Sequence, residues 1–120
     1  MITIQHENNL TVIGIFSTFE VEDFMRIETE IEQQLHAHGA IDLLVDLRGM
    51  MGYTLDTALE DIRFTRQHSR DVGRIAIFSE NNAVVWTALL SRLFVKADIR
   101  VFDSESGARE WLKAGRVESD

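Results

Sequence analysis

Three short runs of almost unbroken apolar residues constrain this chain more than any other feature of its sequence. They occupy 41–47, 74–78 and 99–102. A strand whose two faces are both covered has such a continuous apolar sequence, which is typical of the inner strands of parallel sheets. The segments between the runs have the length and apolar spacing of helices. The sequence therefore predicts parallel strands joined by right-handed helical crossovers.

The first forty residues predict a hairpin followed by a helix. Residues 2–6 and 10–16 have strand-like patterns and are separated by turn-forming residues at 7–9. From 21 to 38 the apolar residues recur at intervals of three and four, which indicates one buried stripe of an amphipathic helix. Gly39 is suited to end this helix in a left-handed conformation.

Two further helices are predicted between the apolar runs, and a last helix near the end of the chain. Thr54 is placed to cap a helix that runs to about Ser69, and a strongly apolar helix is expected over 83–95. Ser104 is placed to cap the final helix, whose apolar side chains include Trp111. The order ββαβαβαβα predicts an α/β domain with a mostly parallel five-stranded sheet and an N-terminal antiparallel hairpin.

Length and composition limit the class of protein. A chain of 120 residues with 45% hydrophobic residues predicts a single globular domain over 1–120. The sequence has no cysteine, which excludes disulfides, thiol catalysis and thiolate metal sites and fits a reducing compartment. No apolar stretch approaches the roughly 18 residues that a membrane-spanning helix needs. We therefore expect a cytoplasmic protein without integral membrane association.

Charge and histidine content point away from nucleic acids and metals. Twenty acidic residues against twelve basic ones give a formal charge of −8, which repels phosphate backbones. The four histidines are His6, His36, His38 and His68. His36 and His38 are two apart on a helix, so they do not share the i, i+4 spacing of a metal pair. We expect surface histidines, with no metal and no cofactor.

In the order of its elements, nearly the whole chain resembles the SpoIIAA-like family of small stand-alone domains. The resemblance is carried by Arg74-Ile75-Ala76-Ile77-Phe78, then 97–102, then Ala108-Arg109-Glu110-Trp111-Leu112. It implies a SpoIIAA-like (βα) superhelix, shared with STAS domains and with the lipid-carrying CRAL-TRIO (Sec14-like) domains. Members of the family mostly lack an assigned biochemical activity, so the resemblance supports a fold more than a function.

The same resemblance raises the question of a phosphorylation switch. Anti-sigma-factor antagonists of the STAS group carry a phosphorylatable hydroxyl where the strand after the first long helix turns into the next helix. In this chain the matching stretch, 46–56, lacks their usual Asp-Ser-Ser-Gly turn. Thr54 is the only hydroxyl near that place besides the phenol of Tyr53. Since Thr54 is also the expected helix cap, a structural role competes with phosphorylation.

Ligands of open α/β sheets bind beyond the carboxyl ends of the strands, where three loops are expected here. These loops are 49–54, 79–82 and 103–106. Two glycines would let the backbone approach a ligand, and two methionines and a tyrosine offer soft apolar surface. The alternative is that both methionines cover the core or a dimer contact. The candidate ligand-binding residues are Gly49, Met50, Met51, Gly52, Tyr53, Thr54, Ser79, Asn81 and Asn82.

The helix expected over 83–95 is apolar around most of its circumference, so a second surface must cover it. Trp86, Leu90 and Phe94 are the candidates for a homodimer interface or for a lipophilic pocket. Asp46 is expected either to pair with Arg48 or to take part in a site. No histidine or nucleophile accompanies it, so no enzyme activity is predicted. We predict a non-enzymatic STAS-like binding or regulatory module that engages a protein or a small hydrophobic ligand. The alternative is a Sec14/CRAL-TRIO-like carrier of a lipid or hydrophobic metabolite.

Overall fold

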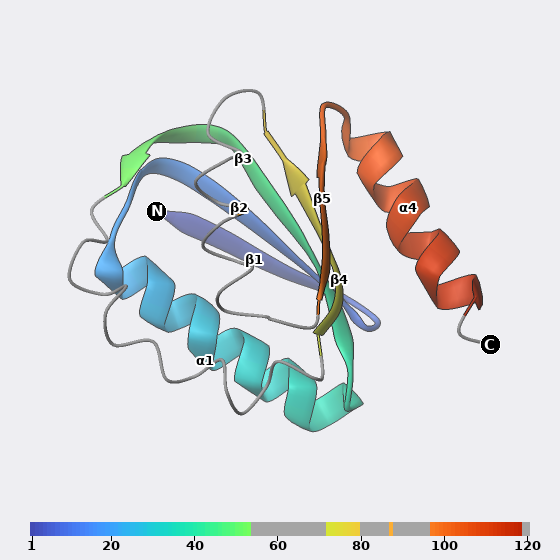
Figure 1. Ribbon diagram of the computed structural model, residues 1–120. Coiled ribbons are helices and arrows are strands. Elements are labelled where there is room, and N and C mark those ends of the chain that lie inside the picture. The colour runs from blue at the N-terminus through green and yellow to red at the C-terminus, as the bar shows by residue number, and fades with distance from the viewer. Residues whose placement is uncertain (54–71, 80–86, 88–96, 119–120) are drawn as a thin grey trace.

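The computed structural model describes residues 1–53, 72–79, 87 and 97–118 (Figure 1). Five strands form one sheet in the order β1-β2-β3-β4-β5, in which only the β1–β2 pair is antiparallel. This confirms the predicted α/β fold with a mostly parallel five-stranded sheet and an N-terminal hairpin. The helices expected over 54–69 and 83–95 lie outside the described residues. The elements are β1 (Ile2–Glu7), β2 (Leu10–Phe19), α1 (Val21–His38), β3 (Ile41–Tyr53), β4 (Val72–Phe78), β5 (Asp98–Phe102) and α4 (Glu105–Glu118).

Helix α1 begins and ends where the sequence predicts. At its start the backbone N–H of Glu20 donates to the carboxylate of Asp23 at 3.0 Å, as in a capping box. At its end Gly39 has a φ of 82°, and its N–H donates to the carbonyl oxygen of Leu35 at 2.7 Å. This positive φ is a conformation that favours glycine, which explains why the helix ends there.

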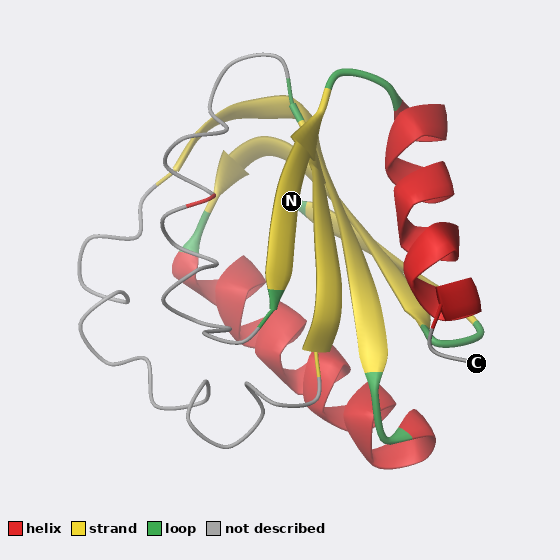
Figure 2. Ribbon diagram, turned by 45° about the vertical axis from the view of Figure 1, so that its right-hand side comes forward, coloured by secondary structure: helices red, strands yellow, loops and turns green. Residues whose placement is uncertain are grey.

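The two described helices cover opposite faces of the sheet (Figure 2). Successive side chains of a strand point to opposite faces, so each inner strand contributes to two cores. The α1 side includes Ile15, Leu43, Val45, Ile75 and Ile77, together with Phe24, Ile31 and Leu35 of the helix. The α4 side includes Leu10, Leu44, Ala76 and Phe78, together with Ala108 and Leu112 of the helix. Burial on both faces explains the continuous apolar runs of β3 and β4.

Helix α4 confirms the cap predicted at Ser104, whose hydroxyl oxygen accepts a hydrogen bond from the N–H of Gly107 at 3.2 Å. Farther along the helix, Trp111 anchors it to the sheet. Its carbonyl oxygen accepts a hydrogen bond from Arg74 of β4 at 2.7 Å, and the same guanidinium lies 4.7 Å from the centre of its ring. Phe102 of β5 contacts this ring with 5.6 Å between centroids.

The strands are longer than the sequence indicates, and β3 corrects one prediction. Residues 49–53 form strand and not a loop, because they pair with 16–19 of β2. β1 pairs with β2 only up to Ile15, and β4 pairs with β3 only up to Asp46, so no other described strand flanks these segments. We call the two paired segments the β2–β3 ribbon. In Figure 1 the two strands arch together toward the start of α1.

The register of the ribbon explains its curvature, and it also explains why 49–53 were predicted as a loop. It shifts between Gly14 and Phe16 and again between Ser17 and Thr18, so β3 carries the extra residues there. Ser17 also has a positive φ of 55°. Bulges of this kind bend a strand and increase its twist, and a glycine inside a strand often marks one. Similarly, β4 begins at Val72, before the predicted apolar run.

Candidate docking surface at the carboxyl end of the sheet

The β2–β3 ribbon has one buried face and one exposed face. Phe19 and Met50 point toward the α1 core, where they are 0% and 7% exposed. Phe16 and Met51 are not buried, with exposed fractions of 43% and 85%. Of the residues expected to form a ligand-binding loop, Met50 is therefore a core residue and Met51 a surface residue. The alternative that methionine covers the core holds for Met50 alone.

The ring of Phe16 rests on two glycines, one on its own strand and one on the neighbouring strand. A Cβ atom added to Gly49 would lie 2.7 Å from Cδ1 of Phe16, and one added to Gly14 would lie 3.4 Å from its Cε2. The Cβ at Gly14 would also lie 2.7 Å from the hydroxyl of Thr3 on β1. Any side chain at Gly49 would push the ring away. The glycines thus fix an aromatic ring that remains partly open to solvent.

Arg48 precedes Gly49 in β3 and is held by Asp46. Its Nε and Nη2 donate to the two carboxylate oxygens of Asp46 at 3.1 and 2.9 Å, and its backbone N–H donates to the same carboxylate at 3.0 Å. The guanidinium lies 4.1 Å from the centre of the Phe78 ring. Burial alone would raise the pKa of Asp46, but the hydrogen bonds and charge of Arg48 outweigh it and lower the pKa. The predicted Asp46–Arg48 pair is confirmed.

A row of charged side chains joins this pair to α4 and to the β1–β2 hairpin. Glu105, at the start of α4, has one carboxylate oxygen 3.9 Å from Nη2 of Arg48 and the other 2.9 Å from Nε of Arg109. Arg109 also donates to both carboxylate oxygens of Glu7, at 3.1 and 3.3 Å. Hydrogen bonds to Glu7 and Glu105 raise the pKa of Arg109. These ion pairs fix α4 over the sheet and leave the ribbon outside its cover.

Two exposed methionines, Met1 and Met51, lie beside or within the ribbon. Three of the four methionines, Met1, Met25 and Met51, are exposed. The carbonyl oxygen of Met1 accepts a hydrogen bond from the N–H of Phe16 at 2.8 Å, which places Met1 beside the ribbon. Met25 lies in the first two turns of α1, the helix that follows the ribbon in the chain. Methionine is flexible and polarizable, and such side chains adapt to different partner surfaces.

The remaining predicted site residues are not all placed by the structure. Ser79 follows β4 and is buried, and its N–H donates to the carbonyl oxygen of Phe102 at 3.3 Å. Gly52 and Tyr53 belong to the ribbon. The other candidates, Thr54, Asn81, Asn82, Trp86, Leu90 and Phe94, lie outside the described residues. Ligand binding, phosphorylation and dimerisation at those positions remain predictions.

Phe16 and Phe78 are parts of this surface that the sequence does not single out, whereas Glu105 falls within the strand-end segment predicted over 103–106. Phe16 was read only as the end of an apolar strand. One signal could have identified it, because Gly14 lies two residues before it and so on the same face of β2. A glycine beside an aromatic ring on one face of a sheet leaves room for the ring to lie flat. No such signal marks Phe78, and both Phe78 and Glu105 meet Arg48 only through the fold.

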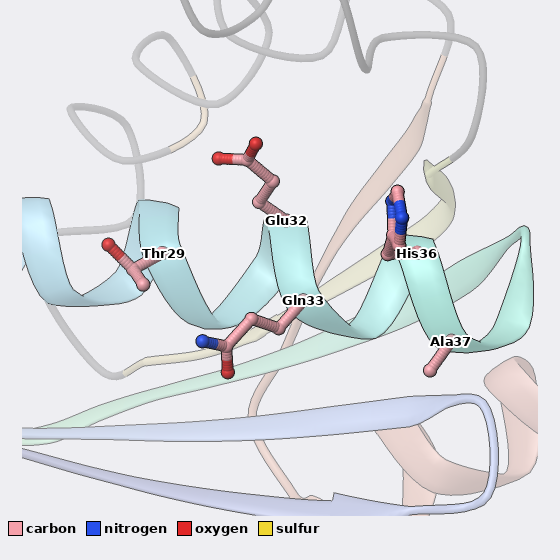
Figure 3. Close-up of a pocket in the computed structure, with 5 residues that line it drawn as sticks. All are labelled: Thr29, Glu32, Gln33, His36 and Ala37. Atoms are coloured by element: carbon pink, nitrogen blue, oxygen red, sulfur yellow. The ribbon is translucent and has the colours of Figure 1, made fainter.

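A hollow of about 500 Å³ lies along the outer side of α1. Figure 3 shows that Glu32 and His36 extend from the same side of the helix, one turn apart. Within the described part of the chain, no group of three or more histidine, cysteine or acidic residues could hold a metal ion. The described lining residues are Thr29, Glu32, Gln33, His36 and Ala37.

Known structures reproduce this architecture. An uncharacterized protein of the DUF3478 family with a SpoIIAA-like fold, from Shewanella loihica PV-4, superimposes with a TM-score of 0.68 at 20% identity, over 93% of this chain and 92% of its own. The anti-sigma factor antagonist SpoIIAA in its unphosphorylated form gives a TM-score of 0.58 at 11% identity, over 97% and 98%. The phosphorylated form of the Bacillus cell fate determinant SpoIIAA gives 0.57 at 11%, over 93% and 99%. At these identities the likeness concerns the fold.

The family of this chain is identified from its sequence. None of the curated protein sequences matches this chain. Neither described helix is long and apolar enough to cross a lipid bilayer. The model of the SpoIIAA-like family matches residues 10–113, which include every described strand except β1. The chain therefore belongs to the SpoIIAA-like family, as the order of its elements and its closing segments predict.

Proposed function

We propose that this protein is a non-enzymatic, STAS-like regulatory module that binds a protein partner through the exposed face of the β2–β3 ribbon. One observation carries the proposal: the ring of Phe16 is held on Gly14 and Gly49 yet is 43% exposed, beside the almost fully exposed Met51. A fixed, exposed aromatic ring loses little freedom when a partner covers it. Binding sites gain affinity from such preorganised groups.

The composition of this surface is typical of protein interfaces. Aromatic residues, methionine and arginine are enriched in interface cores, and a few such anchors provide most of the binding energy. Phe16, Met51 and Arg48 represent all three types on neighbouring positions of two strands. Arg48 is half exposed and stacked on Phe78, so its planar group is also held in place.

A regulatory role is supported further by the chemistry of the site and by the structural relatives. Asp46 and Arg48 satisfy each other, and a lowered pKa makes Asp46 a poor general base near neutral pH. Two of the similar structures are of SpoIIAA, one described as an anti-sigma factor antagonist, a name that denotes action on a protein. The alternative of a lipid carrier needs an apolar cavity of roughly 300 Å³ or more. We favour a protein partner because the exposed groups of the ribbon are of the kinds that are enriched at protein interfaces.

Site-specific photocrosslinking tests the proposal. A photoreactive phenylalanine analogue replaces Met51 in one version of the protein and the exposed Lys113 of α4 in a control version. In the native cells we expect one crosslinked protein from position 51 and none from position 113. The purified partner should then bind the unlabelled chain, and Phe16→Ala should weaken that binding by about tenfold or more, as for an interface anchor. The proposal would be refuted if both positions crosslinked the same proteins. It would also be refuted if Phe16→Ala left the affinity for the partner unchanged.

A further inference from the structure

We propose that the outer edge of β1 pairs with the same edge of a second copy of this chain, so that the two sheets join into one. This edge is a different surface from the β2–β3 ribbon, and the proposal therefore goes beyond the proposed function and does not depend on it. Two observations carry it. They are the backbone groups that β1 leaves unpaired and the side chains that flank them.

The backbone of β1 alternates between its neighbour β2 and the outer edge, because antiparallel strands exchange hydrogen bonds at every second pair. The carbonyl oxygen of Met1 accepts a hydrogen bond from the N–H of Phe16 at 2.8 Å, and the register with β2 is regular from there to the end of β1. The odd-numbered residues of β1 therefore bond to β2. The N–H and carbonyl groups of Ile2, Ile4 and His6 point outward, and no strand of the described sheet pairs with them.

The features that protect many edge strands from pairing are missing in β1. Natural edges are blocked by lysine, proline, bulges or inward-pointing charges. β1 contains neither lysine nor proline, its register with β2 has no shift, and its one acid, Glu7, is held by Arg109 of α4. β5, at the other end of the described sheet, differs because it carries the exposed charges of Asp98 and Arg100. Of these two edges, that of β1 is therefore suited to pairing.

The edge of β1 is complementary to itself in one register. When Ile4 pairs with the partner's Ile4 about a two-fold axis, Ile2 lies opposite the partner's His6. All the outward-facing backbone groups then join in hydrogen-bonded pairs, with about six hydrogen bonds in total. On the other face of the strand, Thr3 lies opposite the partner's Gln5. No like charges meet in this register, which would otherwise oppose the pairing.

The side chains along β1 are already ordered by the fold. Ile2 is buried and Ile4 is partly buried against the α1 core. Nε2 of His6 lies 3.1 Å from the carboxylate of Glu30 in α1, so this acid beside the edge already has a partner. A surface that is ordered before it binds loses little freedom in the complex.

A second copy also accounts for how the assembly ends. A two-fold pair uses the same edge in both copies, so it closes at two chains and leaves no free β1 edge for further growth. A strand of another protein can bond to the same backbone groups, but it has no built-in match to the alternating side chains of β1. The experiment below separates these two occupants.

Analytical ultracentrifugation of the full chain over a range of concentrations tests the proposal, and we expect a monomer–dimer equilibrium. Thr3 and Gln5 are both exposed, so they can be changed without disturbing the core. Thr3→Lys with Gln5→Lys places lysines opposite each other across the two-fold axis and should raise the dissociation constant about tenfold. Thr3→Glu with Gln5→Lys places opposite charges there and should restore the dimer. As a control, Ser106→Lys with Ala114→Lys adds the same charge on α4 and should change the constant less than about twofold.

Hydrogen exchange of the backbone amides, followed by NMR, gives a second readout. In the dimer the amides of Ile4 and His6 should be protected from exchange. In the double-lysine variant these two amides should exchange quickly, whereas the amide at position 5 should stay slow because it bonds to β2. Slow exchange at position 5 also shows that the variant is folded.

The outcomes separate this proposal from the proposed function. A chain that sediments as a monomer at every concentration would overturn the β1 dimer and leave the edge to a strand of another protein. A dimer with the same dissociation constant in all the charge variants would also overturn it, since the contact would lie elsewhere. If Phe16→Glu dissociated the dimer and the two lysines did not, the contact would lie on the ribbon, and both proposals would fail.

Discussion

The guanidinium of Arg48 lies 4.1 Å from the centre of the Phe78 ring, a contact between two strands whose residues are 30 positions apart in the chain. Because Asp46 grips the same guanidinium with two hydrogen bonds, the arginine is fixed in orientation while half of it remains in contact with water. A preformed cationic plane therefore stands on β3, and its strength can be measured.

Replacing Arg48 by alanine should lower the free energy of unfolding by about 0.5–1 kcal/mol, a small loss because exposed cation–π contacts and ion pairs are weak. Urea denaturation followed by circular dichroism measures it. Arg26→Ala on α1 is the matched control and should cost less than half as much. An equal loss in both variants would show that the contact with Phe78 contributes nothing specific.

The Asp46–Arg48 pair should make stability depend on pH. The folded-state pKa of Asp46 is below its ordinary value of 3.8, so its contribution is present above that value and is lost as the pH falls through the lowered pKa. Asp46→Asn should therefore reduce stability at pH 7 and have a much smaller effect near pH 2.5. Urea titrations at both pH values measure the difference, with Asp103→Asn as control. A loss that is independent of pH would contradict the ion-pair explanation.

Glu28 should show the opposite sign. Burial and the charge of Glu32 raise its pKa above the ordinary value of 4.5, so ionising it costs more in the folded than in the unfolded state. The folded state loses stability as the pH rises above that value. Glu28→Gln should therefore raise the thermal midpoint at pH 7 and give little gain at pH 3. A variant that is destabilised at pH 7 would mean that Glu28 makes a favourable contact as a carboxylate.

The close contact between the ring of Phe16 and Gly49 can be tested with a pair of nearly identical substitutions. Gly49→Ala places a Cβ 2.7 Å from the ring and 3.3 Å from the carbonyl oxygen of Ile15, so it should cost roughly 1–3 kcal/mol. Gly52→Ala, three residues along the same strand, meets nothing within 4 Å and should change stability by less than about 0.5 kcal/mol. Chemical denaturation compares the two. Similar values for both would remove the steric explanation.

A double-mutant cycle isolates the contact itself. In a Phe16→Ala background the added methyl group at position 49 no longer meets the ring, so Gly49→Ala should cost less than in the original protein. If the cost is the same in both backgrounds, the backbone near Ile15 is what the methyl group meets, and Phe16 is not held by Gly49.

The α/β fold was predicted correctly where it depends on patterns within a single helix or strand. The stripe of α1 and the stop at Gly39 define that helix, and burial on both faces makes β3 and β4 continuous apolar runs. The ribbon was not predicted because glycines at 49 and 52 resemble a loop, and only the pairing with β2 shows that they are strand residues. A bulge depends on the register of two strands, which single-strand patterns do not contain.

The candidate surface was predictable only in part. The Asp46–Arg48 pair follows from two positions in one strand, and Met51 was named, although as a loop residue. The ring of Phe16 lies against Gly49, which is 33 positions away in the chain. The guanidinium of Arg48 stacks on Phe78, which belongs to another strand. Contacts of this range arise only when the chain is folded, so composition and spacing carry no trace of them.

The irregular register of the ribbon also bears on how these molecules avoid one another. Both ribbon strands extend past the ends of β1 and β4, and an open strand edge can act as a template on which a second molecule adds a strand. On β2, Met1 already bonds the N–H of Phe16 and the carbonyl oxygen of Thr18. The two breaks in register twist this segment and interrupt any regular ladder along its margin. The distortion that leaves Phe16 accessible therefore also guards against aggregation, and straightening the ribbon would remove that protection.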